Sequence, residues 1–240
     1  MVNGLVHTNL KTVSRVGLQF FFLFCVCCSL ILLQNSCISV SLNTNFKRGN
    51  GNIVSSVLPI TPFTSIVSSI PCRYKIVKAD TSHCRIEIDD NLIGYLDVSV
   101  KDSVLYLQSS YAFFTSTEPV IYITSPSIDS IVNLALSTIT INNVCDRMVV
   151  HQKAGSIITL NGSANESLFE IDNSGEIHAA NFPTSITYAY ANGYGVIKTS
   201  TDSLFAKCTG KGKVEYTQRS AKEVFVKKIL LDKGSVKEIR

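Results

Sequence analysis

The stretch "AYANGYGVI" (189–197) joins two strand-like segments through a turn that contains two glycines. Related phrases occur as "HQKAGSII" (151–158), "FEIDNSGEI" (169–177), "AKCTGKGKV" (206–214) and "ILLDKGSV" (229–236). An aliphatic residue follows each turn, in steps of 18 to 22 residues, at Ile139, Ile157, Ile177, Val196, Val214 and Val236. A period of about 20 residues with two or three strands per unit is typical of a solenoid, whose stacked coils share one core. The sequence therefore predicts a parallel β-helix with one such turn per coil.

Beyond residue 40, the alternation of apolar and polar residues predicts β-strands throughout. Segments such as "FTSIVSSI" (63–70) and "YLDVSVKDSVLYLQSS" (95–110) are short, rich in β-branched residues and bounded by Asp, Asn, Ser or Pro. Two more, "CRYKIVKA" (72–79) and "CRIEIDD" (84–90), flank a turn at 79–82 and predict a hairpin. No segment in this part of the sequence has the periodicity of an amphipathic helix, so we expect an all-β protein.

The first 39 residues predict export. Lys11 and Arg15 precede eighteen uncharged residues, "VGLQFFFLFCVCCSLILL" (16–33). A basic segment followed by an apolar one is typical of a signal peptide, and about 20 apolar residues span a bilayer. Residues 1–39 are thus a signal peptide or an N-terminal membrane anchor, and the basic flank places the rest of the chain outside the cytoplasm.

Cys37 is a candidate lipidation site. It ends "LLQNSC" just after the apolar segment, where bacterial lipoproteins carry the Cys that becomes the lipidated N-terminus. Ser36 suits that pattern, whereas Gln34 and Asn35 match it poorly. Lipidation, simple cleavage and an uncleaved anchor therefore all stay open.

Composition divides the remaining chain into two parts. Residues 40–59 are polar and rich in Gly and Asn, which predicts a tether. Residues 60–240 carry the strand pattern and form the predicted β-helix domain. Four cysteines fall in that domain, Cys72, Cys84, Cys145 and Cys208. In the expected hairpin Cys84 lies opposite Val77, so a disulfide to Cys72 needs another register; free, buried thiols are the alternative. None of the four has the paired spacing of a zinc site.

The order of the strand segments resembles the head GIN domain family of bacterial envelope proteins, described as autotransporter adhesin heads. The resemblance covers about residues 60–218 and is carried by Phe63 to Ile66, "YKIVKADTSHCRIEIDDN" (74–91), "VSVKDSVLYLQ" (98–108), "PVIYITSPSIDSIVNLALSTITI" (119–141) and the repeats. This chain has few of the Gly-Ser-Gly corners found in many members. The resemblance implies a right-handed, single-stranded parallel β-helix and an envelope location, and no particular molecular activity.

One group of side chains is a candidate face for an anionic ligand. The segment "KCTGKGKVEY" (207–216) offers Lys207, Lys211, Lys213 and Tyr216. They belong to a basic C-terminal region, 207–240, with ten Lys or Arg against four Asp or Glu. Such a region suits contact with anionic lipid, polysaccharide or nucleic acid. It equally suits a solvated end of a solenoid, because Lys on terminal strands opposes further pairing.

Catalytic and metal-binding patterns are absent from the sequence as we interpret it. Only Glu170 and Asp172 lie two residues apart on one strand face, without a second acidic pair one coil away. His151 and His178 fall on strands two coils apart, so we expect no metal and no cofactor. Among the aromatic residues, Tyr106 to Phe114 form the densest cluster, suited either to stacking on sugars or to capping the solenoid.

These observations favour an exported, membrane-tethered envelope protein that acts as an adhesin-like binding module and not as an enzyme. Its expected partners are the membrane, through the N-terminal segment, and a glycan or an envelope protein, with no nucleic acid. A structural, self-associating envelope protein is one alternative. A polysaccharide-active enzyme on the same scaffold is another.

Overall fold

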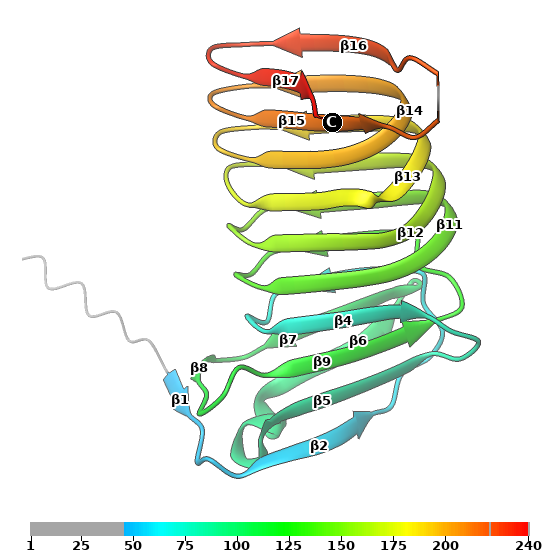
Figure 1. Cartoon of the computed structure of the whole chain (residues 1–240). Coiled ribbons are helices and arrows are strands. Elements are labelled where there is room, and N and C mark those ends of the chain that lie inside the picture. Colours follow the sequence, from blue (N-terminus) through cyan, green and yellow to red (C-terminus); the bar gives the residue numbers. More distant parts are fainter. Residues whose placement is uncertain (1–45, 221, 240) are drawn as a thin grey trace, which may run out of the picture. The chain divides into compact units, whose positions relative to one another are not determined.

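The computed structural model describes residues 46–220 and 222–239, and nearly all of its regular structure is β-strand (Figure 1). In chain order the elements are β1 (Phe46–Arg48), β2 (Ile53–Leu58), β3 (Ser65–Ser68), β4 (Arg73–Lys78), β5 (His83–Asp89), the 3₁₀ helix η2 (Asp90–Tyr95), β6 (Leu96–Lys101), β7 (Val104–Ser109), β8 (Ala112–Phe114), β9 (Val120–Ser125), β10 (Ser130–Asn133), β11 (Thr138–Gln152), β12 (Ile157–Ile171), β13 (Glu176–Ala191), β14 (Val196–Cys208), β15 (Lys213–Gln218), β16 (Phe225–Leu230) and β17 (Ser235–Glu238). The all-β prediction is confirmed.

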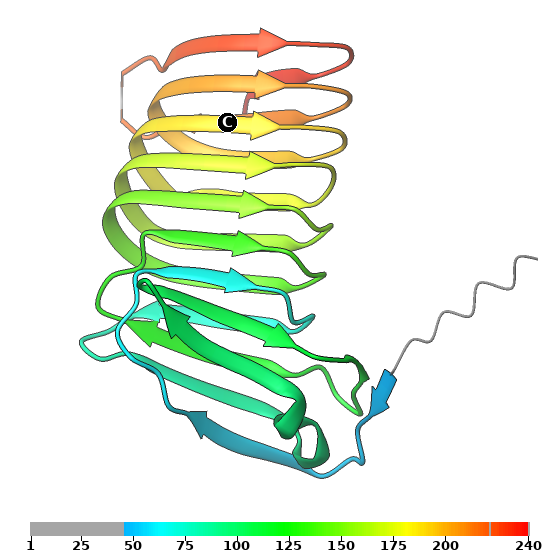
Figure 2. The same cartoon turned by 180° about the vertical axis from the view of Figure 1, so that it is seen from behind.

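The long strands β11 to β14 each bend once and contribute to two layers that enclose the core (Figures 1 and 2). Layer 1 contains β2, β5, β9, β4, the first halves of the long strands, β15 and β17. Layer 2 contains β6, β7, β3, β10, the second halves of the long strands, and β16. Successive coils pair in parallel and form a β-solenoid of about five turns, which confirms the predicted solenoid.

One inward row of layer 1 repeats an aliphatic side chain on each coil. The register aligns Ile139, Ile158, Ile177, Ile197, Val214 and Val236, which are 17 to 22 residues apart. The prediction that Ile157 and Val196 belong to this row is wrong by one residue, since Ile157 is 44% exposed and Val196 pairs beside Lys213 on the outer side. Each is followed by a second aliphatic residue, so alternation alone does not decide which one points inward, and a one-residue slip exchanges the faces.

The N-terminal third departs from regular coils. The predicted hairpin between β4 and β5 does not form, because β9 lies between them, parallel to β4 and antiparallel to β5. A hairpin does join β6 and β7, where Asp102 and Ser103 both have positive φ, as a tight two-residue hairpin turn requires. The chain thus closes this end of the stack with antiparallel strands before the coils begin.

The stretch expected to be a tether, 40–59, carries β1 and β2 in its described part. β2 pairs antiparallel with β5, so the chain from Ile53 onward is part of the folded unit. The predicted signal or anchor at 1–39, and Cys37 with it, lie outside the described residues. Within residues 46–220 and 222–239, no helix combines the length and apolar character needed to span a bilayer.

A glycine is required at one bend between the layers. Gly162, in the middle of β12, has φ of +121° and pairs with Asn143 on the coil below. A Cβ on Gly162 would lie 1.7 Å from the carbonyl oxygen of Asn143. Asn143 itself is buried, and its side-chain Nδ2 donates a hydrogen bond of 2.6 Å to the carbonyl oxygen of Ile128. The close approach of two backbones therefore leaves no room for a side chain.

The substitution Gly162→Ala is expected to lower the free energy of unfolding by about 2–4 kcal/mol, because it combines an unfavourable φ with a backbone clash. Gly94→Ala is the matched control, since a Cβ there meets nothing within 4 Å and φ is not positive. Urea denaturation followed by circular dichroism measures both. Equal stability of the two variants would contradict the close approach at this bend.

Candidate functional site

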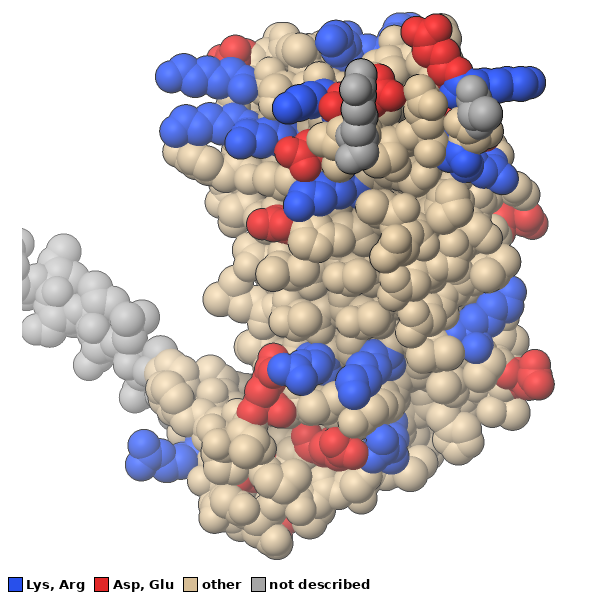
Figure 3. Space-filling model, in the orientation of Figure 1, with Lys and Arg blue, Asp and Glu red and all other residues tan. Residues whose placement is uncertain are grey.

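The outer faces of the two layers differ in chemistry. The central outer row of layer 1 is polar or charged: Lys75, Thr140, Thr159, His178, Lys198, Glu215 and Lys237. Figure 3 shows this face with its charged side chains over the coils at either end of the stack and an uncharged band over the middle coils. Layer 2 instead presents one row of partly exposed aliphatic and aromatic side chains, which are Val149, Leu168, Tyr188 and Phe205. The row beside it is mixed and runs Val132, His151, Glu170, Tyr190 and Lys207.

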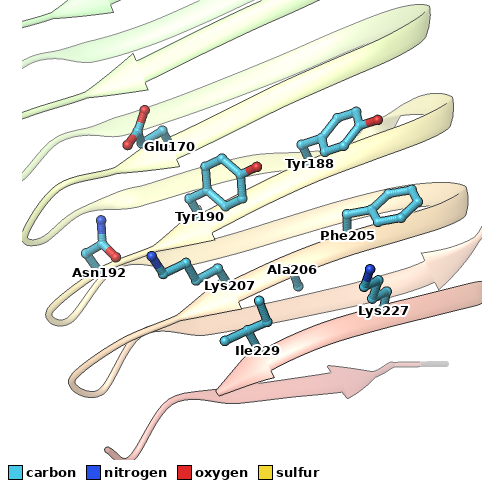
Figure 4. A pocket seen from close by; sticks show the side chains of 9 residues that line it. All are labelled: Glu170, Tyr188, Tyr190, Asn192, Phe205, Ala206, Lys207, Lys227 and Ile229. Carbon is cyan, nitrogen blue, oxygen red and sulfur yellow. The ribbon is translucent and has the colours of Figure 1, made fainter. Parts of the chain in front are cut away.

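A groove of about 490 Å³ lies on the outer face of layer 2, over β13, β14 and β16 (Figure 4). Its lining residues are Glu170, Tyr188, Tyr190, Asn192, Phe205, Ala206, Lys207, Lys227 and Ile229. The register arranges most of them in two rows that cross the strands. One row runs Glu170, Tyr190, Lys207 and Ile229, and the other runs Tyr188, Phe205 and Lys227. Neighbours within a row lie about 4.8 Å apart, as in any pair of adjacent strands.

Stacked aromatic rings form one wall of the groove. Tyr188 and Phe205 occupy equivalent positions on adjacent coils, and their ring centroids lie 5.1 Å apart at 17° between planes. Phe205 also meets the ring of Phe225, with centroids 5.9 Å apart at 57°. The spacing of adjacent strands brings the rings together, and each pair adds stability beyond its buried area. The three rings expose a continuous aromatic surface.

The charged groups of the groove are one carboxylate and two ammonium groups, from Glu170, Lys207 and Lys227. None of the ion pairs formed among the described residues includes either lysine. Lys207 instead stands between Tyr190 and Ile229 in its row, and Lys227 pairs beside Phe205. Both cations are therefore available to an anionic ligand next to the aromatic wall.

At the edge of the groove, the structure brings His151 to the acidic pair Glu170 and Asp172, a contact that the sequence analysis did not predict. His151 pairs across the ladder with Glu170, and its Nε2 lies 3.8 Å from Oε2 of Glu170 and 3.1 Å from Oδ2 of Asp172. A nitrogen and two carboxylate oxygens, all within 4.8 Å of one another, are donors that suit a divalent metal ion. The step of 19 residues from His151 to Glu170 matches the repeat period, and this spacing is the signal in the sequence that could have predicted the contact.

The four residues of the predicted anion face, Lys207, Lys211, Lys213 and Tyr216, do not lie on one surface of the structure. Lys207 lies on the outer side of layer 2, whereas Lys213 lies on the outer side of layer 1, across the turn between β14 and β15. Lys211, in that turn, places its ammonium nitrogen 4.9 Å from the ring centroid of Tyr194. Tyr216 packs against the core, and the loss of solvation raises the pKa of its hydroxyl. Of the four, only Lys207 lines the groove.

The aromatic cluster predicted near Tyr106 divides between two places. Tyr106 lies on the outer side of layer 2, beside Val67. Tyr111 contacts the ring of Tyr95 at 5.0 Å, and Phe114 contacts Phe46 at 4.8 Å. These contacts lie among β1, β8 and η2, away from the groove.

The four described cysteines are free, so a Cys72–Cys84 disulfide is not formed. Burial raises the pKa of the thiols of Cys72 and Cys84 to about 12, and that of Cys145 to about 11. Desolvation also raises the pKa of Cys208. Because the thiolate is the nucleophile, these side chains act as core packing and not as reactive groups.

Comparison with known proteins identifies relatives of this architecture. The family model described as "Putative auto-transporter adhesin, head GIN domain" matches residues 62–219. No curated protein matches the chain significantly.

Solved structures from three bacteria share the fold. A protein from Bacteroides fragilis described as "a putative adhesin" is similar over 80% of this chain and 100% of its own, with a TM-score of 0.64 and 19% identity. A "putative adhesin" from Parabacteroides merdae is similar over 81% of this chain and 99% of its own, with a TM-score of 0.51 and 19% identity. A "putative lipid binding protein" from Parabacteroides distasonis is similar over 81% of this chain and 100% of its own, with a TM-score of 0.51 and 17% identity.

The buried thiols generate a prediction about pH and reactivity. A pKa near 12 for Cys84, against an ordinary value of 9.0, leaves about a thousandfold less thiolate at pH 8. Labelling of the folded domain with iodoacetamide at pH 8 is expected to be slower by about that factor than labelling in urea, as measured by mass spectrometry of the Cys84 peptide. Labelling at similar rates in both conditions would show that this thiol is accessible and ionised.

Proposed function

Because this chain belongs to the head GIN domain family, we propose that it is an adhesin-like protein of the bacterial cell envelope that binds its partner without covalent chemistry. The family match and the shared solenoid architecture support an adhesin-like role. The apolar segment at 16–33 and its basic flank support export and retention at a membrane. Binding is assigned to the outer face of layer 2.

The observation that carries this assignment is the contrast between the two outer faces. Layer 1 presents Thr, His, Lys and Glu in its central row, which water solvates well. Layer 2 holds Tyr188, Phe205 and Phe225 in contact at its surface, with a groove beside them. Aromatic clusters at a surface, bordered by polar groups, are typical of binding sites.

The chemistry of the groove supports binding in preference to hydrolysis. Hydrolysis of a glycosidic bond uses two carboxyl groups that face each other across it. Among the described residues that line the groove, only Glu170 contributes a carboxylate. The other charged groups of the lining are the ammonium groups of Lys207 and Lys227. Asp172, an acidic residue in the turn that follows β12, is hydrogen-bonded to His151.

Self-association through the last coil is a second candidate. β16 exposes Phe225, Ile229 and Leu230 by 42–60%, and its outer edge has no partner strand among the described residues. An unpaired strand with apolar side chains favours pairing with another copy, whereas Lys227 and Lys228 on the same strand oppose it. Gel filtration at increasing concentration separates the two candidates, since concentration-dependent oligomers without ligand binding favour self-association.

The membrane attachment has its own test. Mass spectrometry of the mature N-terminus, in membrane and soluble fractions of the producing cell, is expected to give either an acylated peptide that begins at Cys37 or an intact N-terminus in the membrane fraction. Both results place the binding domain at a membrane surface. A free N-terminus near Ser39 in the soluble fraction would contradict the tether.

The binding face is tested with two double variants. Beads coated with the domain are expected to be retained on arrays of glycans and of envelope proteins, and Tyr188→Ala with Phe205→Ala is expected to reduce retention about tenfold or more, because truncated aromatic anchors dominate losses in binding. Thr140→Ala with Thr159→Ala, on the outer row of layer 1, is the matched control and should retain binding. Equal losses in both variants would remove the assignment to layer 2, and retention on no surface would contradict the binding function.

A further inference from the structure

The groove on layer 2 combines features that one class of ligand satisfies together. Its wall is the stacked pair Tyr188 and Phe205, which offers a flat apolar surface. Its second row supplies a carboxylate, a phenol hydroxyl and an ammonium group in sequence, from Glu170, Tyr190 and Lys207. A ligand that fills it must therefore carry an apolar face and several hydrogen-bonding groups on one compact ring system.

The net charge of the groove indicates the sign of the charge on its ligand. Lys207 and Lys227 carry two positive charges without an ion-pair partner among the described residues, against one negative charge on Glu170. Hydrogen bonds from ammonium to carboxylate are about twice as strong as those between neutral groups. An anionic group on the ligand pairs with these lysines, while Glu170 accepts hydrogen bonds from neutral hydroxyl groups.

Other ligand classes satisfy the groove less well. A purely apolar helix would bury Glu170 and Lys207 without partners, which costs more than its apolar contacts return. An added peptide strand pairs with a sheet edge, whereas this groove lies on the face of β13 and β14. Single-stranded nucleic acid also stacks on aromatic rings, but it needs a track of cations along a repeated phosphate backbone. Here two lysines share the groove with a carboxylate, and no repeated row of cations forms.

We propose that this groove is a binding site for a sugar ring that bears a carboxylate, within an acidic polysaccharide. This inference rests on the proposed binding function and names its ligand. The apolar face of the pyranose stacks on Tyr188 and Phe205. The carboxylate accepts hydrogen bonds from the ammonium groups of Lys207 and Lys227, and Glu170 and Asn192 hydrogen-bond to the ring hydroxyls. The volume of about 490 Å³ lies within the range of small-molecule sites.

The experiment is isothermal titration calorimetry of the folded domain, residues 46–239, with three acidic oligosaccharides: trigalacturonate, trimannuronate and a heparin tetrasaccharide. Methyl-esterified trigalacturonate is the neutral counterpart, and an eight-nucleotide oligo-dT is the nucleic-acid competitor. We expect at least one of the acidic sugars to bind about tenfold or more tightly than the ester. We also expect affinity to fall as salt rises from 50 to 300 mM, because the pairs at an open groove are screened.

The variants separate ligand contacts from effects on folding. Lys207→Gln and Lys227→Gln are each expected to weaken acidic-sugar binding by about tenfold, whereas Lys207→Arg keeps the charge and most of the affinity. Lys198→Gln is the matched control, because Lys198 is on the same strand as Lys207 but faces outward from layer 1. Circular dichroism of each variant checks that the fold is intact.

The outcomes distinguish this inference from the function on which it rests. Equal affinity for the acid and its ester, tighter binding of oligo-dT, or no binding of any of the three acidic sugars overturns the assignment of the ligand. Equal losses for Lys198→Gln and Lys207→Gln overturn the assignment of the groove. In each of these cases the adhesin-like function still stands if coated beads are retained in a manner that depends on Tyr188 and Phe205, and it falls if they are not.

Discussion

In-register parallel pairing of successive coils is the constraint on which the rest of the structure depends. It places each residue about 4.8 Å from its equivalent on the next coil, so a row is a column of adjacent side chains. Inward rows must then be complementary in size, and either apolar or hydrogen-bonded within the core, as Ser68 is to Asn133 and Ser167 to Thr187. Phe169, fully buried, stacks against Ala189 and Val150, and the small Ala189 leaves room for the ring. Burial of such a side chain contributes about 1.5–3 kcal/mol.

The same pairing determines what the surface can do. Outward rows carry no packing requirement, so their chemistry is set coil by coil. On layer 1 the central outer row is hydrophilic and keeps the face solvated, with partners such as Glu215 beside Lys198. On layer 2 the coils at the C-terminal end bring Tyr, Phe and Lys into adjacent positions, and these side chains line the groove. Its residues lie about one repeat period apart in the chain and are adjacent in the stack.

The sequence predicted the all-β class and the period because both are written in local patterns of apolar and turn residues. It misplaced Ile157 and Val196, since two aliphatic neighbours compete for one inward position. It also predicted a hairpin from β4 and β5, because adjacency in the chain favours pairing, whereas β9 inserts between them after 30 intervening residues. The register between strands far apart in the chain decides which residue points inward and which strands pair.

The candidate site was predicted only in part, for the same reason. Lys207 was identified, but its grouping with Lys213 followed position in the chain and ignored the turn that sends the two residues to different layers. The neighbours that complete the groove, Tyr190 and Phe205, are one period away or on the other row. Applying the repeat period to every outward residue brings His151 to Glu170 and Tyr188 to Phe205. That step requires the exact register of neighbouring coils, and β-bulges or other irregularities shift this register by one or two residues from a constant repeat.

The direction of the backbone hydrogen bonds has a mechanical consequence for an attached protein. These bonds run along the stack, and each coil contacts only its neighbours. β2 lies at one end of the stack and the groove near the other (Figure 1). In the proposed tethered and ligand-bound state, tension between the two attachment points would therefore pull coils apart one at a time. Each coil of about 20 residues would release roughly 65–70 Å of chain as it opens, and this extension would dissipate load before the proposed contact breaks.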